Sequence, residues 1–320
     1  MSRHDSAAGH QPTQIVWPEG KKFAFTVFDD PDYQRLEGGQ AVYSLLRDLG
    51  FRTTKGVWPL ASPLGDDNSG VTCHDPGVLP WLKDLQQSGF EIGFHNASTH
   101  TSTREQTIAG LDAFREFFGS DPATMAQHFL CDEGIYWGAE RVSGLRRAAY
   151  ALFTLGRNRG KSRGSQPGDP LFWGDVCQSR IRYMRNFVFR DTNTLQRCPY
   201  MPYHDDDRPF VHMWYASTDG VGVERFCEAV SEANQDRLEE EGGACIMYTH
   251  FAYRFYRDGQ LNARFRELMV RMSRKNGWFV PVGTLLDFLR STRSQNNITK
   301  PDRARLENRW LLDKIRYGTS

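Results

Sequence analysis

The stretch FTVFDDPDY, residues 25–33, contains an apolar run that ends in two adjacent carboxylates. Residues 21–28 (KKFAFTVF) are rich in aromatic and β-branched side chains, which is typical of a buried strand. Asp29, Asp30 and Pro31 then indicate its end. Successive side chains of an extended chain point to opposite sides. Asp29 and Asp30 can therefore face the same way only if the strand has already ended.

Further strand patterns alternate with helical patterns along most of the chain. Strands are predicted at 51–60, 90–95, 124–129, 180–189, 210–217 and 242–251. Helices are predicted at 38–51, 78–89, 102–119, 139–150, 223–241, 262–277 and 304–318. Residues 278–291 are predicted to form a strand that runs directly into the last helix of the barrel. This alternation predicts an α/β protein with a mostly parallel sheet, and the number of units fits a distorted or incomplete (β/α) barrel. We expect a flexible tail at 1–15, the barrel at 16–292 and a helical extension at 293–320.

One helix is predicted in more detail than the others. Residues 102–119 begin with Ser102 or Thr103 as a cap, followed by Glu105 or Gln106 in a capping-box pattern. The apolar residues Ile108, Leu111, Phe114 and Phe117 recur at helical spacing, so we expect them in the core.

Composition narrows the class of protein. The 320 residues are 39% hydrophobic and 25% charged with a net charge of +1, so no overall field favours nucleic acid or an anionic membrane. No apolar run reaches the length of a membrane helix, and residues 1–14 lack the apolar segment of a signal peptide. The six cysteines form no CxxC pair and suggest reduced thiols. We therefore expect a cytoplasmic protein that does not insert into membranes or bind nucleic acid; a homo-oligomer is compatible with the sequence.

Several polar residues follow the predicted strands, where barrel enzymes carry their chemistry. They are Asp29, Asp30, His95, His128 and His250. Taken singly, such residues are more often caps or turn residues. Taken together, they are explained by one divalent metal ion held by an Asp and two His, with a second carboxylate beside the water position. Zn²⁺ is the expected ion, and Co²⁺, Ni²⁺ or Fe²⁺ would also suit these ligands.

The motifs FTVFDD, EIGFH with a second His close behind, and IMYTH near the end of the chain are the basis of a family resemblance. Because these motifs occur in this order, the chain resembles the polysaccharide deacetylases of the NodB-homology superfamily over about residues 20–292. That family has a distorted (β/α) barrel and a metal-dependent hydrolytic activity on acetylated sugars. The resemblance implies Asp29 as general base, Asp30 and His95 as metal ligands, and His250 as general acid.

The second motif, HNASTH, departs from the family pattern. His95 and His100 are five residues apart, where the family has four, so on a helix they would not share a face. Either a one-residue insertion bulges the loop, or Thr99 has replaced a ligand. We retain His100 as the predicted third ligand.

The third family motif, R-x-P-[YF], is replaced by AQHFLCDEGIYWG at residues 126–138. One interpretation is a turn with a packed aromatic pair. The other is a substrate platform, with Tyr136 or Trp137 stacking on a sugar and His128 near the metal. A literal R-C-P-Y at 197–200 is attributed to chance.

Three further questions stay open from the residues alone. Asp175 and Asp219 are both candidates to orient His250. Arg182 and Arg185 could pair with active-site carboxylates, with a substrate anion or in structural ion pairs. Residues 157–170 could be a plain loop or a lid.

The leading hypothesis is a metal-dependent hydrolase that removes an acetyl or similar acyl group from an amino sugar or sugar conjugate. An intracellular precursor of surface polysaccharide or of a secondary metabolite fits the expected location, so the partner is a small molecule or oligosaccharide. The alternative is a catalytically silent carbohydrate-binding barrel. A third hypothesis, phosphoryl transfer through the D-x-D in DDPD, leaves the histidines without a role.

Overall fold

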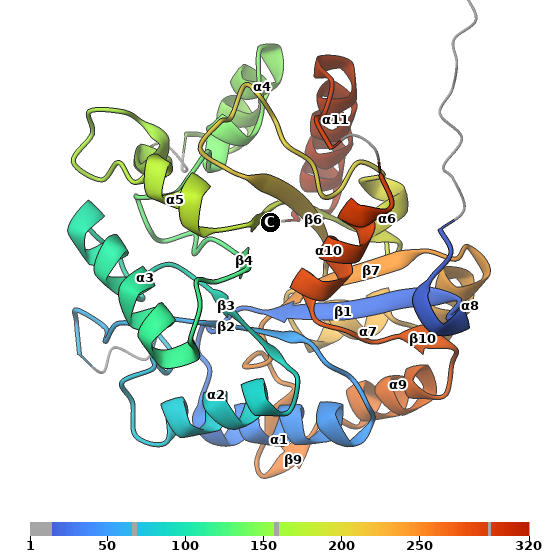
Figure 1. Cartoon of the computed structure of the whole chain (residues 1–320). Helices are drawn as coiled ribbons and strands as arrows, with labels where there is room; N and C mark the ends of the chain where they lie inside the picture. Colours follow the sequence, from blue (N-terminus) through green and yellow to red (C-terminus); the bar gives the residue numbers. More distant parts are fainter. Residues whose placement is uncertain (1–14, 66–68, 157–159, 294–295, 320) are drawn as a thin grey trace, which may run out of the picture.

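A closed barrel of parallel strands forms the centre of the computed structural model, which describes residues 15–65, 69–156, 160–293 and 296–319 (Figure 1). Its strands are β1 (Phe23–Asp29), β2 (Thr54–Val57), β3 (Glu91–Phe94), β4 (Thr124–Met125), β5 (Tyr183–Phe189), β6 (Met213–Asp219) and β7 (Ala244–Thr249). Each pairs with the next in chain order, and β7 pairs with β1 to close the ring. The predicted (β/α) barrel is confirmed. The predicted tail lies outside the described residues except for Ile15.

A short additional strand distorts the barrel. β10 (Gly277–Trp278) pairs with Phe23 and Ala24 at the start of β1. β2 pairs with β1 only at its end, at Phe28 and Asp29. β10 therefore fills the space between β1 and β2 at the end of the barrel opposite the strands' carboxyl ends.

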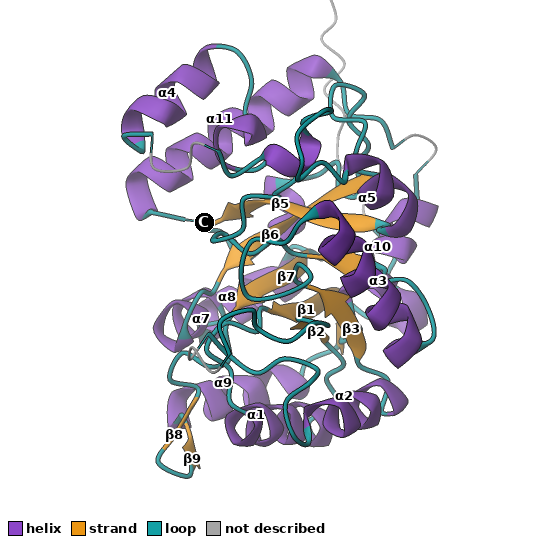
Figure 2. Ribbon diagram, turned by 90° about the vertical axis from the view of Figure 1, so that its left-hand side faces the viewer, coloured by secondary structure: helices purple, strands orange, loops and turns teal. Residues whose placement is uncertain are grey.

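Helices surround the strands on the outside, and a small hairpin projects from one side (Figure 2). The α-helices are α1 (Leu36–Asp48), α2 (Val78–Gln87), α3 (Arg104–Phe118), α4 (Leu145–Phe153), α5 (Gly174–Arg180), α6 (Thr194–Arg197), α7 (Val223–Ala229), α8 (Glu232–Glu240), α9 (Ala263–Ser273), α10 (Val282–Ser291) and α11 (Lys300–Tyr317). The 3₁₀ helices are η1 (Pro18–Gly20), η2 (Gly138–Arg141) and η3 (Arg163–Ser165), and the hairpin is β8 (Tyr256–Arg257) with β9 (Gln260–Leu261). None of the described helices is long and apolar enough to cross a membrane.

Strand β1 shows how the sequence positions the site. All its side chains are buried, because one face packs inside the barrel and the other against the helices. Phe28 lies on the inner face, near the guanidinium of Arg185. Asp29 lies on the outer face, where Tyr43 of α1 donates a hydrogen bond to it. Asp30, two residues after Phe28, again faces inward.

Helix α3 begins with the predicted capping box. Thr103 accepts a hydrogen bond from the Gln106 backbone N–H, and the Gln106 side chain accepts one from the Thr103 backbone. Leu111 and Phe114 are buried as expected, whereas Ile108 and Phe117 are only half-buried. The face toward the core is therefore rotated slightly from the predicted one.

The C-terminal helix is part of the main core. Trp310 and Leu306 of α11 are fully buried, and Trp310 stacks on Tyr150 of α4 with a centroid distance of 5.5 Å. Glu307, also fully buried, accepts hydrogen bonds from Ser143 and Arg146. Figures 1 and 2 both show α4 and α11 side by side at one end of the molecule.

Candidate metal centre

A cavity of about 300 Å³ opens at the carboxyl ends of the barrel strands. Its wall includes strand-end residues and parts of η2, α4 and α11. The lining residues are Asp30, Asp32, His95, Gln127, His128, Phe129, Trp137, Arg141, Tyr150, Arg185, Tyr248, His250, Lys314, Gly318 and Thr319.

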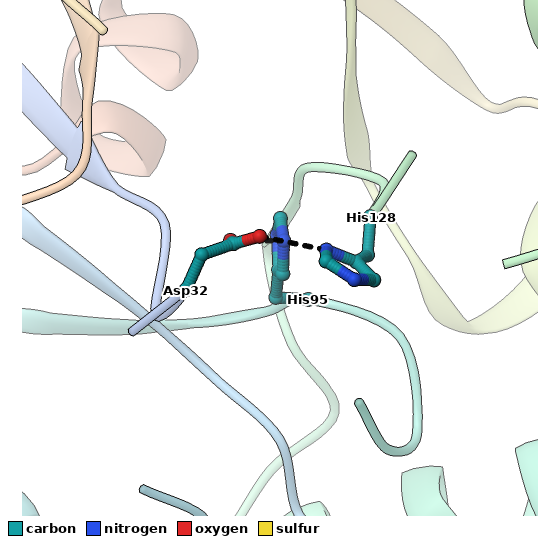
Figure 3. Close-up of side chains that lie close together, drawn as sticks. All are labelled: Asp32, His95 and His128. Carbon is teal, nitrogen blue, oxygen red and sulfur yellow. Dashed lines mark ion pairs between the residues drawn. The ribbon is translucent and has the colours of Figure 1, made fainter. Parts of the chain in front are cut away.

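Three buried side chains in this cavity form a candidate metal-binding cluster: Asp32, His95 and His128 (Figure 3). Asp32 Oδ2 lies 3.2 Å from His95 Nε2, and Asp32 Oδ1 lies 3.0 Å from His128 Nδ1. Asp32 follows β1, His95 follows β3 and His128 follows β4, so the parallel strands bring the three residues to one rim. A second group, of Asp30, Asp32 and His250, shares Asp32 with the first.

The ring nitrogens of this cluster lack ordinary partners. Both nitrogens of His95, both of His128, and Oδ2 of Asp32 are buried without a hydrogen-bond partner of acceptable geometry. Buried polar atoms in folded proteins are almost always satisfied. One carboxylate and two imidazoles that converge in this way suit Zn²⁺, Co²⁺, Ni²⁺ or Fe²⁺. The residues present therefore fit the metal expected from the sequence.

Charge in the cluster is arranged to keep the carboxylate ionised. Burial alone would raise the pKa of Asp32, but the close imidazoles of His128, His250 and His95 hold it well below its usual range. Burial lowers the pKa of His95, which favours the neutral imidazole that a metal ion needs.

Asp30 is held by an arginine inside the barrel. Arg185 of β5 donates to both carboxylate oxygens of Asp30, at 2.9 and 2.5 Å, and both side chains are buried. Asp30 Oδ1 also lies 3.9 Å from His95 Nδ1. Of the three pairings considered for Arg185, the structure shows the one with an active-site carboxylate. Arg182 instead pairs with Asp287 at the surface.

Asp29 does not face the cavity. Its carboxylate is fully buried and forms an ion pair with Lys55 of β2, with a distance of 2.7 Å between Nζ and Oδ2. It also accepts a hydrogen bond of 2.8 Å from the backbone N–H of Phe251. Strand β1 runs through Asp29, so this side chain points to the helix layer and not to the rim. The geometry does not support the general-base role expected for Asp29, and its contact with Phe251 anchors the segment that carries His250.

His250 is oriented by a backbone carbonyl. Its Nδ1 lies 3.1 Å from the oxygen of Val221, and its Nε2 lies 3.4 Å from Asp32 Oδ2. Burial lowers the pKa of His250, but the neighbouring Asp32 outweighs it, and the net pKa is raised. Asp219 influences His250 indirectly. It accepts a hydrogen bond from the backbone N–H of Val221, and the carbonyl of Val221 is the group that contacts His250. Asp175 pairs with Arg104 elsewhere.

His100 does not join either cluster. It is half-exposed, and Thr99 Oγ1 lies 2.8 Å from its Nδ1. The loop after β3 turns away at Asn96, which has a positive φ of 63°. Asn96 accepts a hydrogen bond from the His128 N–H and donates one to Glu133, both at 2.8 Å. The loop thus brings His128, not His100, to the position beside His95.

The two aromatic residues of the predicted substrate platform behave differently. Trp137 lines the cavity, whereas Tyr136 stacks on Phe210 and is not among the lining residues. The backbone N–H groups of both residues donate to serine hydroxyls, Tyr136 to Ser165 and Trp137 to Ser162. Ser162 and Ser165, in the described part of loop 157–170, thus fix the backbone of this segment through hydrogen bonds. Residues 157–159 lie outside the described residues.

Comparisons with known proteins place the fold. Neither models of known protein families nor curated proteins match the sequence. A Mycobacterium smegmatis protein assigned as a polysaccharide deacetylase matches in structure over 91% of this chain and 99% of its own, with a TM-score of 0.54 and 14% identity. Puue allantoinase matches over 92% of this chain and 98% of its own, with a TM-score of 0.52 and 12% identity. The chain therefore has the polysaccharide deacetylase fold, and the predicted resemblance is confirmed at that level.

Proposed function

We propose that this protein is a metal-dependent hydrolase that removes an acetyl or similar acyl group from an amino sugar or sugar conjugate, as a divergent member of the polysaccharide deacetylase superfamily. The observation that carries the proposal is the buried cluster of Asp32, His95 and His128, whose ring nitrogens converge on Asp32 but have no hydrogen-bond partner of acceptable geometry. These three residues would hold the ion, with Zn²⁺ as the expected one. Such an ion, when bound, lowers the pKa of a water molecule and polarises an acyl carbonyl.

Asp30 is the proposed general base. It lines the cavity next to the cluster, and its bidentate pair with Arg185 fixes the carboxylate in one orientation. In this role Asp30 accepts a proton from the water that adds to the acyl carbon. The roles expected from the family motif are thus shifted along the chain: Asp30 takes the base position expected for Asp29, and Asp32 takes the ligand position expected for Asp30.

His250 is the proposed general acid. The Val221 carbonyl, 3.1 Å from Nδ1, orients the ring so that Nε2 faces the cavity. His250 would donate its proton to the leaving nitrogen as the carbon–nitrogen bond breaks. The cavity of about 300 Å³ is at the small end of ligand pockets, which supports a single sugar unit or similar precursor over a polymer.

The test is metal content by elemental analysis, combined with acetate release from a panel of N-acetylated sugars. We expect about one equivalent of metal in the wild type, since the two candidate groups among the described residues share Asp32. His128→Ala should lose both the metal and the hydrolysis. His100→Ala is the matched control, because it removes an imidazole that lies outside the cluster, and it should retain both.

Two results would contradict the proposal. Metal retained in His128→Ala and lost in His100→Ala would restore the family's own ligand pair. Sugar binding that survives a chelator, with no hydrolysis of any acylated sugar, would favour the silent carbohydrate-binding barrel.

A further inference from the structure

A buried arginine lines the same cavity without an anionic partner. Arg141 of η2 is only 3% exposed, and its Nε has no hydrogen-bond partner. Among the described residues no carboxylate forms an ion pair with it, whereas the two other buried arginines of this part of the chain, Arg185 and Arg208, each have one. A buried charge is costly unless it is paired, so an unpaired guanidinium at a cavity wall is suited to bind an anion.

The guanidinium of Arg141 contacts two aromatic rings. Its central carbon lies 3.4 Å from the ring centroid of Trp137 and 5.3 Å from that of Trp310. Stacking uses the faces of the guanidinium and leaves its N–H edges available. Those edges match the paired oxygens of a carboxylate or phosphate.

A second cation lines the cavity close to the first. Lys314 of α11 is half-buried, and its Nζ donates a hydrogen bond of 2.6 Å to the backbone carbonyl of Thr319. No described carboxylate forms an ion pair with Lys314 either. Burial and the nearby Arg141 lower the pKa of Lys314 to about 8, and burial lowers that of Arg141 to about 9. Both groups therefore remain mainly protonated at neutral pH.

We propose that Arg141 and Lys314 form an anion subsite that binds a carboxylate or phosphate of the substrate. This inference rests on the proposed function and narrows the substrate to a small acylated molecule that carries a negative charge. The acyl group would lie at the strand-end cluster, and the anionic group at the wall that η2 and α11 build. The subsite would select against neutral sugars, because they leave the two cations unpaired.

The test compares ligands that differ in charge, by calorimetric titration of the protein as purified with its metal at neutral pH. The probes are N-acetylglucosamine 6-phosphate, N-acetylmuramate and uncharged N-acetylglucosamine, so phosphate and carboxylate are measured separately. We expect at least one anionic probe to bind about tenfold to hundredfold tighter than the neutral sugar. Which anion shows the larger gain identifies the group that the subsite prefers.

Arg141→Gln should abolish this preference, and Arg147→Gln should keep it. Arg147 is the matched control because its side chain is 54% exposed and pairs with Glu140 outside the cavity. Should Arg141→Gln fail to fold, Lys314→Gln decides, with an expected loss of roughly threefold to tenfold in the preference. Equal binding of charged and neutral probes in the wild type, or a preference unchanged in the variants, overturns the subsite and leaves Arg141 as a structural cation between two rings.

The two proposals fail in different ways. Metal content and acetate release are measured on the same preparations. A clear anion preference without metal or hydrolysis would contradict only the proposed function. Metal and hydrolysis of neutral sugars without an anion preference would contradict only the subsite.

Discussion

The adjacent carboxylates of Asp29 and Asp30 lie in different environments, because successive side chains of a strand point to opposite faces. Asp29 points to the helices and compensates the buried Lys55, whereas Asp30 points into the barrel and pairs with Arg185. Asp32 returns to the inner side two residues later, beyond Pro31. A single motif of four residues thus supplies a structural ion pair, a candidate base and a candidate metal ligand.

The first prediction separates the structural carboxylate from the ligand. We expect Asp29→Asn to lower the free energy of unfolding by about 3–5 kcal/mol, because Lys55 would stay buried without its charge partner. Metal content should be unchanged, since Asp29 does not line the cavity. Asp32→Asn should show the reverse, with metal lost and stability less affected. Urea unfolding and elemental analysis of both variants measure this, and loss of metal in Asp29→Asn would contradict the assignment.

The second prediction concerns pH. Lys314 has a pKa lowered to about 8, so it loses its charge as the pH rises through that value. Arg141 on η2 lowers this pKa, Asp219 on β6 raises it, and the Trp310 ring and the Thr319 carbonyl also contact the amine. The binding preference for N-acetylglucosamine 6-phosphate should therefore fall between about pH 7 and pH 9. Lys314→Gln should remove the part of this fall centred near 8; an identical profile in the variant would contradict it.

The loop after β3 decides which histidine lies beside His95 in the candidate metal-binding cluster. Asn96 turns the chain with a left-handed backbone conformation and joins the loop to the segment after β4 through His128 and Glu133. The two imidazoles of the candidate cluster, His95 and His128, thus come from two different strand ends and not from one local motif. The five-residue spacing between His95 and His100 needs no helical geometry to bring them together, because only His95 belongs to the candidate cluster.

Asn96→Ala tests this connection. We expect metal affinity to fall about 10-fold to 100-fold, since the backbone of His128 loses its anchor. Stability should fall by about 1–3 kcal/mol, because buried Glu133 loses a donor. Ser98→Ala in the same loop is the control, as its hydroxyl contacts the carbonyl of His100 and the hydroxyl of Ser102, both close by in the chain. Metal titration of the two variants should differ clearly, and equal affinities would mean that Asn96 has no positioning role.

The barrel and its C-terminal helix form one unit around the cavity. Trp310 is fully buried between Tyr150, Phe187 and the guanidinium of Arg141. Gly318 and Thr319, which follow α11, line the cavity itself. The segment predicted to be a helical extension therefore contributes to the cavity wall, including Lys314.

Trp310→Ala tests how far the core and the cavity wall depend on the packing of α11. Removing the ring leaves a large void in the core, so we expect a loss of about 3–5 kcal/mol in the free energy of unfolding. The anion preference should also weaken, because Arg141 loses one of its stacking partners. Leu312→Ala is the matched control on the same helix, since Leu312 is 67% exposed, and it should change stability by less than about 0.5 kcal/mol. Thermal unfolding and calorimetry distinguish the two, and a mild effect of Trp310→Ala would mean that α11 is dispensable.

The sequence by itself determined the barrel and the rim on which its polar residues meet. The periodicity of apolar residues in strands and helices depends on local spacing along the chain. It therefore identified the elements and the strand-end positions of Asp30, His95, His128 and His250. Only the tertiary structure decided the direction of Asp29, because the exact last residue of β1 sets which way each carboxylate points. The pattern D-P-D was the one local signal for Asp32. Nothing local marked Arg141 as a binding residue, because Trp310 and Lys314, which lie beside it, come from more than 150 positions further along the chain.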